Sequence, residues 1–432
     1  MQKIACIFSF KLSSWVSCQK IVFNLHKSYQ LNTDLNLLNF NYSVDQNALE
    51  ILKTAQAIEE AQPDTLIILD HKPHPVVLFQ LLQSFLNTKK PRIIFHVFGD
   101  FTLYYAHWDK LGKMVEGLKV DFIVASHRQK HLLDKFLPEN NKSYVCPFPV
   151  DKHEFSYNPS LRSLQRKEWG ITDKDYVFTF TGRLSRQKRI HTVLRAFNDF
   201  LLETKAQNAH LYLYGPTDHI GDQFVGKWET EGEYFRKINR IYRSLPQETQ
   251  DKIHFMGAVP NVELKAVYQG ADMLLNLSVH NDEDYGMSVA EAQCSGLPAI
   301  ITDWGGLASF YNKELPTAVT LIPVKIGQTS KLIHYKSSVK AMVDAWNRNK
   351  SEDRKEISET ALKRFSVEAC YEILNDVIDQ DREAFTKFTP FFKKAVKNYL
   401  FRATPYIDDY KNINKFYREI YSSYVRNNSK SV

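Results

Sequence analysis

Long hydrophobic runs, paired cysteines and an excess of either charge are missing from most of this 432-residue chain. No stretch approaches the roughly 18 apolar residues that a membrane-spanning helix needs, so we expect no transmembrane segment. The five cysteines are scattered, without a CxxC pair or a histidine at metal-ligand spacing, which argues against a cysteine-held metal and suits a reducing cytoplasm. At the N-terminus, Lys11 cuts short the apolar run MQKIACIFSF, which favours a first β-strand over a secretory signal.

The net charge of +7 is confined to the C-terminal tail. Residues 387–432 carry ten Lys or Arg against three acidic residues, which leaves residues 1–386 neutral. Cations interleaved with aromatics suit either a peripheral contact with anionic lipid at the inner face of the membrane, or aromatics packed on the N-terminal domain with cations facing solvent. Pro390 and Pro405 interrupt any long amphipathic helix and favour the packed alternative. Nucleic-acid binding fits less well, because the charge is local and no known module accompanies it.

With 44% hydrophobic and 24% charged residues, the chain has the balance of a soluble globular protein, and its length predicts two domains. Apolar, β-branched runs alternate with helical stretches, which predicts an α/β fold with doubly wound parallel sheets. The aperiodic segment 144–160 separates two such series, so we place a boundary near residue 155. Two such domains would direct the carboxyl ends of their strands into a shared cleft, where ligands should bind. The expected strands are KIACIFSF, LNLLNF, TLIILD, RIIFHVF and DFIVAS in the first series, then YVFTFTG, AHLYLYG, KIHFMG, DMLLNLS, LPAIIT and AVTLIPV in the second.

Two cations follow the first strand of the second series. In FTGRLSRQKR, Arg183 and Lys188 lie in a loop that leads into the helical stretch RIHTVLRAFNDFLL. Such a pair beside a helix N-terminus suits a diphosphate, because Arg grips phosphate oxygens bidentately, Lys adds a mobile point charge and helix amides favour anions. Gly182 lets the backbone approach a ligand closely. A solvated basic loop is the alternative for this segment taken alone.

Two carboxylates, Glu283 and Glu291, stand in EDYGMSVAEAQCSG after the strand DMLLNLS. A helix is predicted to begin near Met287 and to end at the Gly296 cap before Pro298, which puts Glu291 about one turn in and Glu283 in the preceding loop. An ionised carboxylate accepts two hydroxyl donors at once, so it suits the vicinal diol of a ribose or a hexose. Glutamate that merely complements the helix dipole is the common alternative.

A third loop, TDWGGLASF, follows the strand LPAIIT and offers Gly305 and Gly306 either as an anion cradle or as a simple tight turn. The three loops arrive in order on successive βα units. From about Tyr176 to Phe310 the chain resembles the C-terminal domain of retaining glycosyltransferases of family 4, which have the GT-B fold. The matching pieces are GRLSRQK, LYLYG, IHFMGAVPNVELKAVYQGADMLLNLS, EDYGMSVAEAQCSGLPAI and TDWGG, and RFSVEACYEIL resembles the family's last helical segment.

The resemblance implies two Rossmann-like domains facing across a cleft, with C-terminal helices that cross back to the N-terminal domain. The expected divisions are an acceptor domain over 1–155, a nucleotide-sugar donor domain over 156–365, and the final helices with the basic aromatic tail over 366–432. It also implies transfer of a hexose-type sugar from a nucleotide diphosphate sugar to a hydroxyl of a glycan, glycolipid or other acceptor, with retention of configuration. Biosynthesis of a surface polysaccharide or glycoconjugate is the setting that such a reaction suggests.

The resemblance assigns roles by position. Arg183 and Lys188 would hold the diphosphate next to Gly182, Glu291 would accept the ribose hydroxyls, and Glu283 would hold a hydroxyl of the donor sugar. The backbone would meet sugar hydroxyls and phosphate at Tyr285, Gly286, Met287 and Ser288. No Asp-x-Asp pair occupies a cleft loop, since the middle residue of DED at 282–284 is assigned to the sugar. We therefore expect no metal and no cofactor besides the donor substrate, with cations and helix amides stabilising the leaving group.

The N-terminal half resembles the family more loosely. Where the family often has a glycine-rich loop after the first strand, this chain has KLSSWVSCQK. RIIFHVFGDF resembles a strand ending in a histidine near the reacting sugar, which makes His96 its counterpart, with a structural histidine as the alternative. Two other functions stay open: a sugar phosphorylase or synthase of the same fold, and a GT-B-shaped binding protein that has lost catalysis. The full set of Arg183, Lys188, Glu283 and Glu291 argues against the latter.

Overall fold

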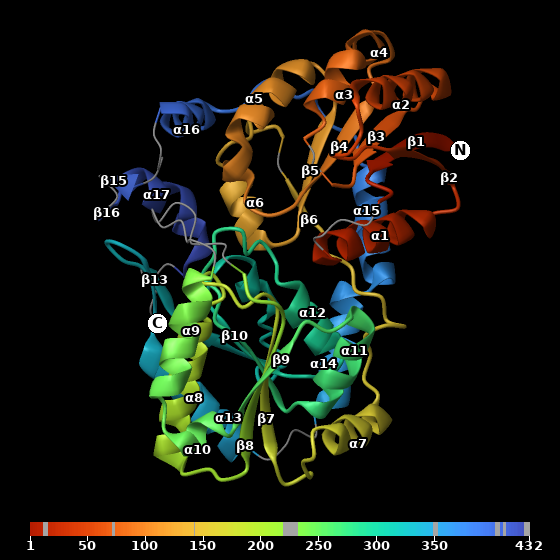
Figure 1. Ribbon diagram of the computed structural model, residues 1–432. Helices are drawn as coiled ribbons and strands as arrows, with labels where there is room; N and C mark the ends of the chain where they lie inside the picture. The colour runs from red at the N-terminus through yellow and green to blue at the C-terminus, as the bar shows by residue number, and fades with distance from the viewer. Residues whose placement is uncertain are drawn as a thin grey trace. The chain divides into compact units, whose positions relative to one another are not determined.

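The chain folds into two compact units (Figure 1). The computed structural model describes residues 1–11, 16–70, 74–141, 143–218, 232–348, 353–401, 407–408 and 412–426. Unit 1 comprises Met1–Pro149 with Phe365–Pro405, and unit 2 comprises Val150–Arg364 with Tyr406–Val432. Each unit contains a parallel six-stranded sheet with helices packed on it, which confirms the predicted α/β class with two doubly wound domains.

The sheet of unit 1 has the strand order β2-β1-β3-β4-β5-β6, and all neighbouring strands pair in parallel. The order reverses between β1 and β3, so the loops after these strands flank the switch point where such sheets bind ligands. Residues 12–15 of the KLSSWVSCQK loop lie outside the described residues. The strands are β1 (Gln2–Phe8), β2 (Leu35–Asn41), β3 (Thr65–Ile68), β4 (Arg92–Val97), β5 (Val120–Val124) and β6 (Tyr144–Val145).

Helices from both ends of the chain complete unit 1. The C-terminal helix α15 packs on α1, where Ser28 Oγ donates a hydrogen bond to the Val367 carbonyl at 2.9 Å, and α16 packs on α5. Asp121 on β5 also holds the C-terminal segment, because it pairs with Arg382 at 3.0 Å. It also pairs with Arg92 of β4 at 2.7 Å, and Arg92 donates to the Val377 and Ile378 carbonyls. The helices are α1 (Val16–Gln30), α2 (Ala48–Ala61), α3 (Val76–Leu81), α4 (Gln83–Lys89), η1 (Phe101–Tyr104), α5 (Tyr105–Met114), α6 (His127–Leu133), α15 (Val367–Asp379) and α16 (Pro390–Phe401).

The sheet of unit 2 has the order β12-β11-β10-β7-β8-β9, again with all pairs parallel, which is the strand order of a Rossmann fold. Its switch point lies between β7 and β10. Strands β7, β10 and β11 are buried along their whole length, as a sheet covered on both faces requires. The strands are β7 (Tyr176–Thr181), β8 (Ala209–Tyr214), β9 (Ile253–Gly257), β10 (Met273–Asn276), β11 (Ala299–Thr302) and β12 (Val319–Ile322).

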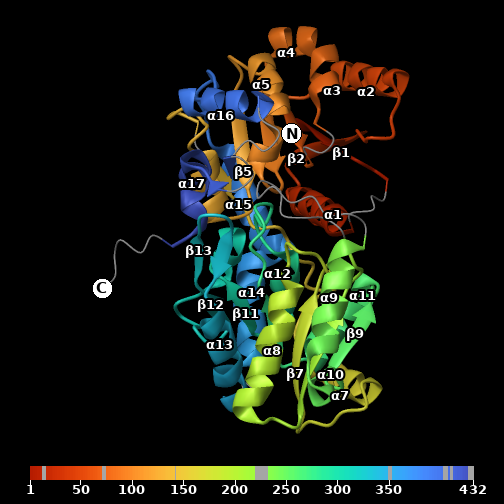
Figure 2. The ribbon, with the colours of Figure 1, turned by 60° about the vertical axis from the view of Figure 1, so that its left-hand side comes forward.

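Helix α8 packs on α9 and α13, and α7 packs on α11 (Figure 2). The helices of unit 2 are α7 (Pro159–Glu168), α8 (Ile190–Thr204), α9 (Glu233–Ser244), α10 (Gln247–Gln250), α11 (Asn261–Gly270), α12 (Met287–Cys294), η2 (Gly305–Phe310), α13 (Tyr335–Asn347), α14 (Arg354–Phe365), α17 (Lys415–Ile420) and η3 (Tyr421–Tyr424). Two short antiparallel pairs are β13 (Val324–Ile326) with β14 (Lys331–Ile333), and β15 (Ile407–Asp408) with β16 (Asn412–Ile413).

The end of the tail differs from the predicted division at residue 366. Helix α17 and η3 belong to unit 2, where the rings of Tyr421 and Tyr424 lie 6.5 and 5.5 Å from that of Trp304. The aromatics of the tail therefore pack, as predicted, but on two different units. Phe388 and Phe392 pack on Phe101 in unit 1. The later tyrosines pack on the buried Trp304, which follows β11 in unit 2. Residues 402–406, 409–411 and 427–432 of the cationic tail lie outside the described residues. Among the helices described, none combines the length and apolar character needed to cross a bilayer.

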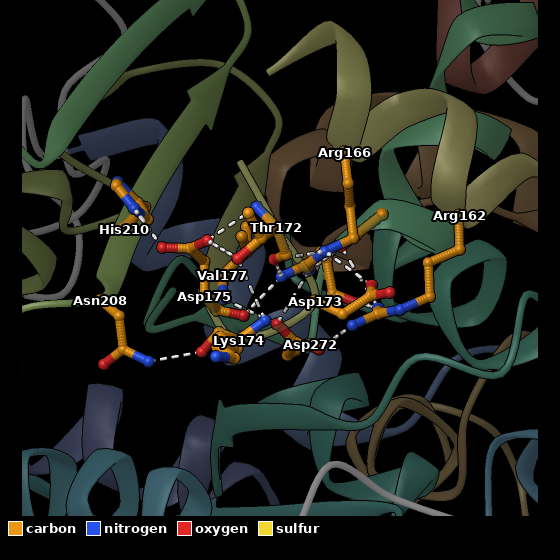
Figure 3. A network of polar contacts seen from close by, with 12 residues as sticks. Arg162, Arg166, Thr172, Asp173, Lys174, Asp175, Val177, Asn208, His210 and Asp272 are labelled. Atoms are coloured by element: carbon orange, nitrogen blue, oxygen red, sulfur yellow. Dashed lines mark hydrogen bonds and ion pairs between the residues drawn. The ribbon is translucent and has the colours of Figure 1, made fainter. Parts of the chain in front are cut away.

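A buried arginine network fastens the amino-terminal side of the unit 2 sheet (Figure 3). Arg166 on α7 is 2% exposed and donates to three backbone carbonyls and to Asp272 Oδ2 at 3.3 Å. Asp272, directly before β10, also accepts from Arg162 at 2.7 Å and from the Val177 amide at 2.8 Å. A single carboxylate therefore joins α7, β7 and β10.

Replacement of this carboxylate by Asp272→Ala is expected to lower the free energy of unfolding by about 3 kcal/mol or more. The buried guanidinium of Arg166 loses its buried counter-charge and is left with the exposed carboxylate of Asp173, 3.4 Å from its Nε. The matched control is Asp344→Ala, which breaks an exposed pair with Lys340 on α13 and should cost within about 0.5 kcal/mol. Urea unfolding followed by circular dichroism measures both variants. Equal losses in the two would contradict the role given to Asp272.

Candidate active site

Two glycines set the position of Arg183. Gly182 follows β7 with φ of 140°, and its amide donates to the Tyr214 carbonyl at 2.9 Å. The loop after β8 approaches so closely that a Cβ at Gly215 would lie 1.9 Å from the Gly182 carbonyl oxygen. Arg183 emerges from this junction, and its Nη1 lies 2.5 Å from Oδ2 of Asp218 in the loop after β8. Sequence reasoning did not single out Asp218, the acid that ends YGPTD.

Lys188 and Glu283 form an ion pair between the loops after β7 and β10. Lys188 Nζ lies 2.5 Å from Glu283 Oε2, and the two side chains are 20% and 6% exposed. The amide of Val279 donates to the Gln187 carbonyl at 3.4 Å, which fastens the same two loops through their backbones. Burial alone would raise the pKa of Glu283, but the ammonium of Lys188, with a hydrogen bond from Ser278, outweighs it and holds that pKa below its usual value. The carboxylate is therefore ionised at neutral pH.

Glu291 lies on α12, the helix predicted to begin near Met287. The helix runs Met287–Cys294 after Gly286, and Gly296 follows with φ of 79°, as the predicted cap requires. Glu291 is 7% exposed and accepts a hydrogen bond from the Tyr268 hydroxyl at 3.3 Å. That hydroxyl lies 2.9 Å from Thr181 Oγ1 at the end of β7. Burial raises the pKa of Tyr268 well above its usual value, so the phenol keeps the proton that it donates.

The structure thus gathers Arg183, Lys188, Glu283 and Glu291 on loops and a helix that follow β7 and β10 of unit 2. Lys188 meets Glu283 directly, and Glu291 is linked through Tyr268 to the residue before Gly182. The backbone sites predicted at Tyr285, Gly286, Met287 and Ser288 span the start of α12, where the first amides of a helix have no partner within it. The Tyr285 ring itself is buried beside Phe310, 4.9 Å between centroids.

The paired glycines of TDWGG have a packing role in addition to the two roles predicted for them. The Gly306 amide donates to the Glu283 carbonyl at 2.8 Å, so it is engaged within the protein. A Cβ would lie 2.5 Å from the Glu283 carbonyl oxygen if added at Gly305, and 1.9 Å from that of Asp284 if added at Gly306. The glycines therefore let η2 pack against the backbone that carries Glu283.

Residues 162–350 match the family model "Glycosyl transferases group 1". This segment contains Arg183, Lys188, Glu283 and Glu291. Mannosylfructose-phosphate synthase of Agrobacterium fabrum is 28% identical over 38% of this chain and 33% of its own length. D-inositol 3-phosphate glycosyltransferase of Corynebacterium jeikeium is 30% identical over 33% of this chain and 30% of its own length. The chain thus spans about a third of the length of these curated relatives.

The fold of most of the chain is shared with solved structures. The crystal structure of Anabaena HepE in complex with UDP aligns over 88% of this chain and 99% of its own, with a TM-score of 0.61 and 14% identity. Together with the two parallel sheets, this likeness identifies the fold as two-domain GT-B. Among the residues that the structure describes, no three His, Cys, Asp or Glu side chains are grouped to hold a metal ion.

A second set of contacts, which sequence reasoning missed, anchors the loop before Glu283. Asn281 Oδ1 accepts from Lys331 Nζ at 2.9 Å and from the Tyr417 hydroxyl at 2.8 Å. Lys331 is 2% exposed, and its ammonium also lies 5.4 Å from the ring centroid of Trp304, whose indole donates to the His280 carbonyl at 2.6 Å. These partners are 50 and 136 residues from Asn281 in the sequence, so no local sequence pattern predicts the contacts.

His96, the predicted counterpart of a histidine near the sugar, lies on β4 of unit 1. Its side chain is 2% exposed, and Nε2 lies 2.8 Å from the Tyr29 hydroxyl. Burial lowers the pKa of His96 to about 3, so the ring is neutral near pH 7. These are the contacts expected of the structural alternative, and a catalytic role for His96 stays a prediction. Asp100, also buried, accepts from the Thr102 amide and caps η1.

Breaking the central ion pair with Lys188→Met is expected to lower the free energy of unfolding by about 2–4 kcal/mol, because Glu283 is left buried and charged. Adding Glu283→Gln should restore part of the loss, and this coupling is what a double-mutant cycle by chemical denaturation measures. The control is Lys355→Met, which removes an exposed pair with Glu359 and should change little.

The stability contributed by Glu283 is also expected to depend on pH. Because its folded-state pKa is lowered, the contribution is fully present above the ordinary value of 4.5 and is lost as pH falls through the folded value. The difference in unfolding free energy between the wild type and Glu283→Gln should therefore shrink below about pH 4.5. A difference that stays constant down to acid unfolding would contradict the ionised pair.

Proposed function

We propose that the protein is a retaining glycosyltransferase that moves a hexose-type sugar from a nucleotide diphosphate sugar to a hydroxyl of a glycan, glycolipid or other acceptor without a metal ion. The observation that carries the proposal is the Lys188–Glu283 pair, which joins the loops after β7 and β10 at the switch point of the sheet, with Glu291 on the following helix α12. These residues lie in the segment that matches the group 1 glycosyl transferases. Parallel sheets bind ligands at this position, beyond the carboxyl ends of the strands.

The donor's nucleotide would bind along the loops after β7 and β10. Glu291 accepts a hydrogen bond from Tyr268 at Oε2, and an ionised carboxylate is an acceptor that suits the vicinal hydroxyls of a ribose. Arg183 would exchange its contact with Asp218 for the diphosphate, which offers the guanidinium more than one charged oxygen. HepE was solved with UDP, which makes UDP the first nucleotide to test.

Lys188 would act on the sugar and the leaving group together. An ammonium has three donors, and Lys188 gives one of them to Glu283. The pair would hold the carboxylate ionised and oriented toward a sugar hydroxyl, while the remaining donors meet the diphosphate. As the bond between the anomeric carbon and the phosphate oxygen breaks, both electrons leave with the diphosphate, and the nearby cation stabilises that growing charge.

The acceptor oxygen would bond to the anomeric carbon on the face that the phosphate leaves, which retains the configuration. Its proton would pass to the departing phosphate oxygen, so no side chain need serve as nucleophile. Contact of the cationic tail with anionic lipid stays a prediction. The phosphorylase and the binding protein, the two alternative functions, differ from a glycosyltransferase in the molecules that they bind and release. The following experiment distinguishes the three.

A thermal-shift screen of UDP, GDP, ADP and their sugar derivatives is expected to identify one nucleotide that stabilises the protein by about 2.7 kcal/mol at 100 times its dissociation constant.

Slow donor hydrolysis without acceptor, followed by proton NMR, should release the sugar first in the donor's anomeric configuration. Inverted product would contradict retention. Binding without hydrolysis or transfer would favour the inactive binding protein, and turnover of a sugar phosphate alone would favour the phosphorylase.

The two glutamates should have separable effects. Glu291→Ala is expected to weaken binding of the free nucleotide at least tenfold, because charged hydrogen bonds to the ribose are lost. Glu283→Gln should leave nucleotide affinity nearly intact and lower kcat on the order of 100-fold, because it acts on the sugar. Calorimetry and initial rates measure the two constants, with exposed Glu263→Ala on α11 as the control. If both variants keep full activity, the assigned roles are wrong.

A further inference from the structure

The end of the basic aromatic tail packs on the part of unit 2 that carries Glu283. This segment, residues 412–426, contains β16, α17 and η3 and belongs to unit 2. Its aromatic and cationic residues are the feature that distinguishes the tail in the sequence. Its contacts reach the loop after β10, where we expect the donor sugar to bind.

Hydrogen bonds fasten the segment along the hairpin of β13 and β14. The Ile413 amide, two residues before α17, donates to the Gln328 carbonyl at 2.5 Å. Within α17, Arg418 donates from Nη1 to the Ile326 carbonyl at 2.7 Å and from Nη2 to the Gly327 carbonyl at 2.8 Å. The planar guanidinium offers these donors in a fixed geometry, so the two bonds set the orientation of the helix as well as its position.

A buried cluster joins the hairpin and α17 to the loop after β10. In this Asn281 cluster, which consists of Asn281, Lys331 and Tyr417, the Asn281 Oδ1 accepts from the ammonium at 2.9 Å and from the hydroxyl at 2.8 Å. The three residues are 1%, 2% and 0% exposed. A buried polar group that loses its partner costs free energy, so both donors hold the Asn281 side chain in place.

Aromatic rings of η3 cover a second support of the same loop. The Trp304 indole donates to the His280 carbonyl at 2.6 Å. The rings of Tyr421 and Tyr424 pack on that tryptophan, and a Cβ at Gly305 would come within 3.2 Å of the Tyr424 ring. The tail therefore supports the loop through Trp304 as well as through the Asn281 cluster.

Glu283 depends on this loop for its position. It lies two residues after Asn281, and its amide donates to the His280 carbonyl at 3.3 Å, which closes a turn. Residues 277–286 connect β10 to α12 outside regular secondary structure, so contacts with neighbouring segments fix the turn. The pair with Lys188 holds only the end of the Glu283 side chain. A displacement of about 1 Å in a group that acts on a reacting sugar can lower the rate on the order of 100-fold.

We propose that Tyr417 is a positioning residue of the donor site, which acts through Asn281 on the loop that carries Glu283. The C-terminal segment is thereby part of the donor site, although Tyr417 lies 136 residues after Asn281 in the chain. This role rests on the transfer function proposed above, in which the Glu283 carboxylate holds a hydroxyl of the donor sugar. The sugar step should depend on Tyr417, whereas nucleotide binding should not, because the ribose is assigned to a residue of α12.

The first test needs no ligand and uses the full chain. The double-mutant cycle of Lys188→Met and Glu283→Gln is repeated in a Tyr417→Phe background, with urea unfolding as the measurement. Loss of the hydroxyl should lower the coupling constant between Lys188 and Glu283 by a factor of about five, the equivalent of one neutral hydrogen bond. A role in stability alone would lower the stability of Tyr417→Phe but leave that coupling unchanged, which would overturn the proposal.

Tyr335→Phe is the matched control. The Tyr335 hydroxyl donates to Asp199 Oδ2 at 2.7 Å and joins α13 to α8, so this variant also loses one tyrosine hydrogen bond within unit 2. It should lower stability but leave the Lys188–Glu283 coupling and kcat as in the wild type. Tyr417→Phe keeps the ring, whose centroid lies 4.5 Å from that of Tyr421, so the packing of the tail is retained.

The second test measures donor hydrolysis with UDP-glucose. Tyr417→Phe should lower kcat about tenfold or more and leave the calorimetric affinity for UDP as in the wild type. In a Glu283→Gln background, the same substitution should lower kcat little further, because it acts through Glu283.

The outcomes separate this role from the transfer function. Lower Lys188–Glu283 coupling in Tyr417→Phe, combined with a wild type that turns over no donor, would support the positioning of the pair and contradict the transfer function. Unchanged coupling and unchanged kcat in Tyr417→Phe would overturn the role of Tyr417 and leave the transfer function intact. Equal losses of coupling in Tyr417→Phe and Tyr335→Phe would also overturn it, because they would reflect a general loosening of unit 2.

Discussion

The candidate active site depends on one ion pair, between Lys188 and Glu283, that closes the switch point of unit 2. It joins the loops after β7 and β10, which are neighbours in the sheet but 95 residues apart in the chain. Burial makes the carboxylate costly to ionise, and the ammonium offsets that cost, so Lys188 keeps Glu283 charged and the two groups orient each other. A site for a charged, hydroxyl-rich donor needs both properties, because a neutral or freely rotating carboxyl would bind sugar hydroxyls less well.

The rest of unit 2 holds that pair in place from two directions. At the carboxyl ends of the strands, Gly306 packs against the Glu283 backbone, and Asn281 receives Lys331 and Tyr417 from a hairpin and from the tail. At the amino ends, Asp272 gathers two arginines and supports β10 itself. Charges that stabilise the sheet therefore stand at its amino-terminal edge, and the charges that we propose for donor binding stand at its carboxyl-terminal edge.

Much of the fold could be predicted because buried parallel strands are continuous apolar runs, and all eleven expected strands are present. The start and end of α12 could also be predicted, because Gly286 precedes the helix and Gly296 and Pro298 follow it, and these residue types commonly flank helices. Strands β6, β13, β14, β15 and β16 were missed because two or three residues carry no periodicity. The tail was predicted to pack, but its aromatics do not encode which surface receives them, and Tyr421 and Tyr424 pack on Trp304.

The sequence by itself determined two α/β units, the loops that carry Arg183, Lys188 and Glu283, and the helix that carries Glu291. It could do so because hydrophobic periodicity and cap residues act over a few neighbouring positions. Tertiary structure alone decided the partners: Asp218 for Arg183, Tyr268 for Glu291, Tyr29 for His96, and α9 for Arg186. A pairing between residues tens of positions apart depends on strand order and on the close approach of backbones at glycine. No local pattern carries that information.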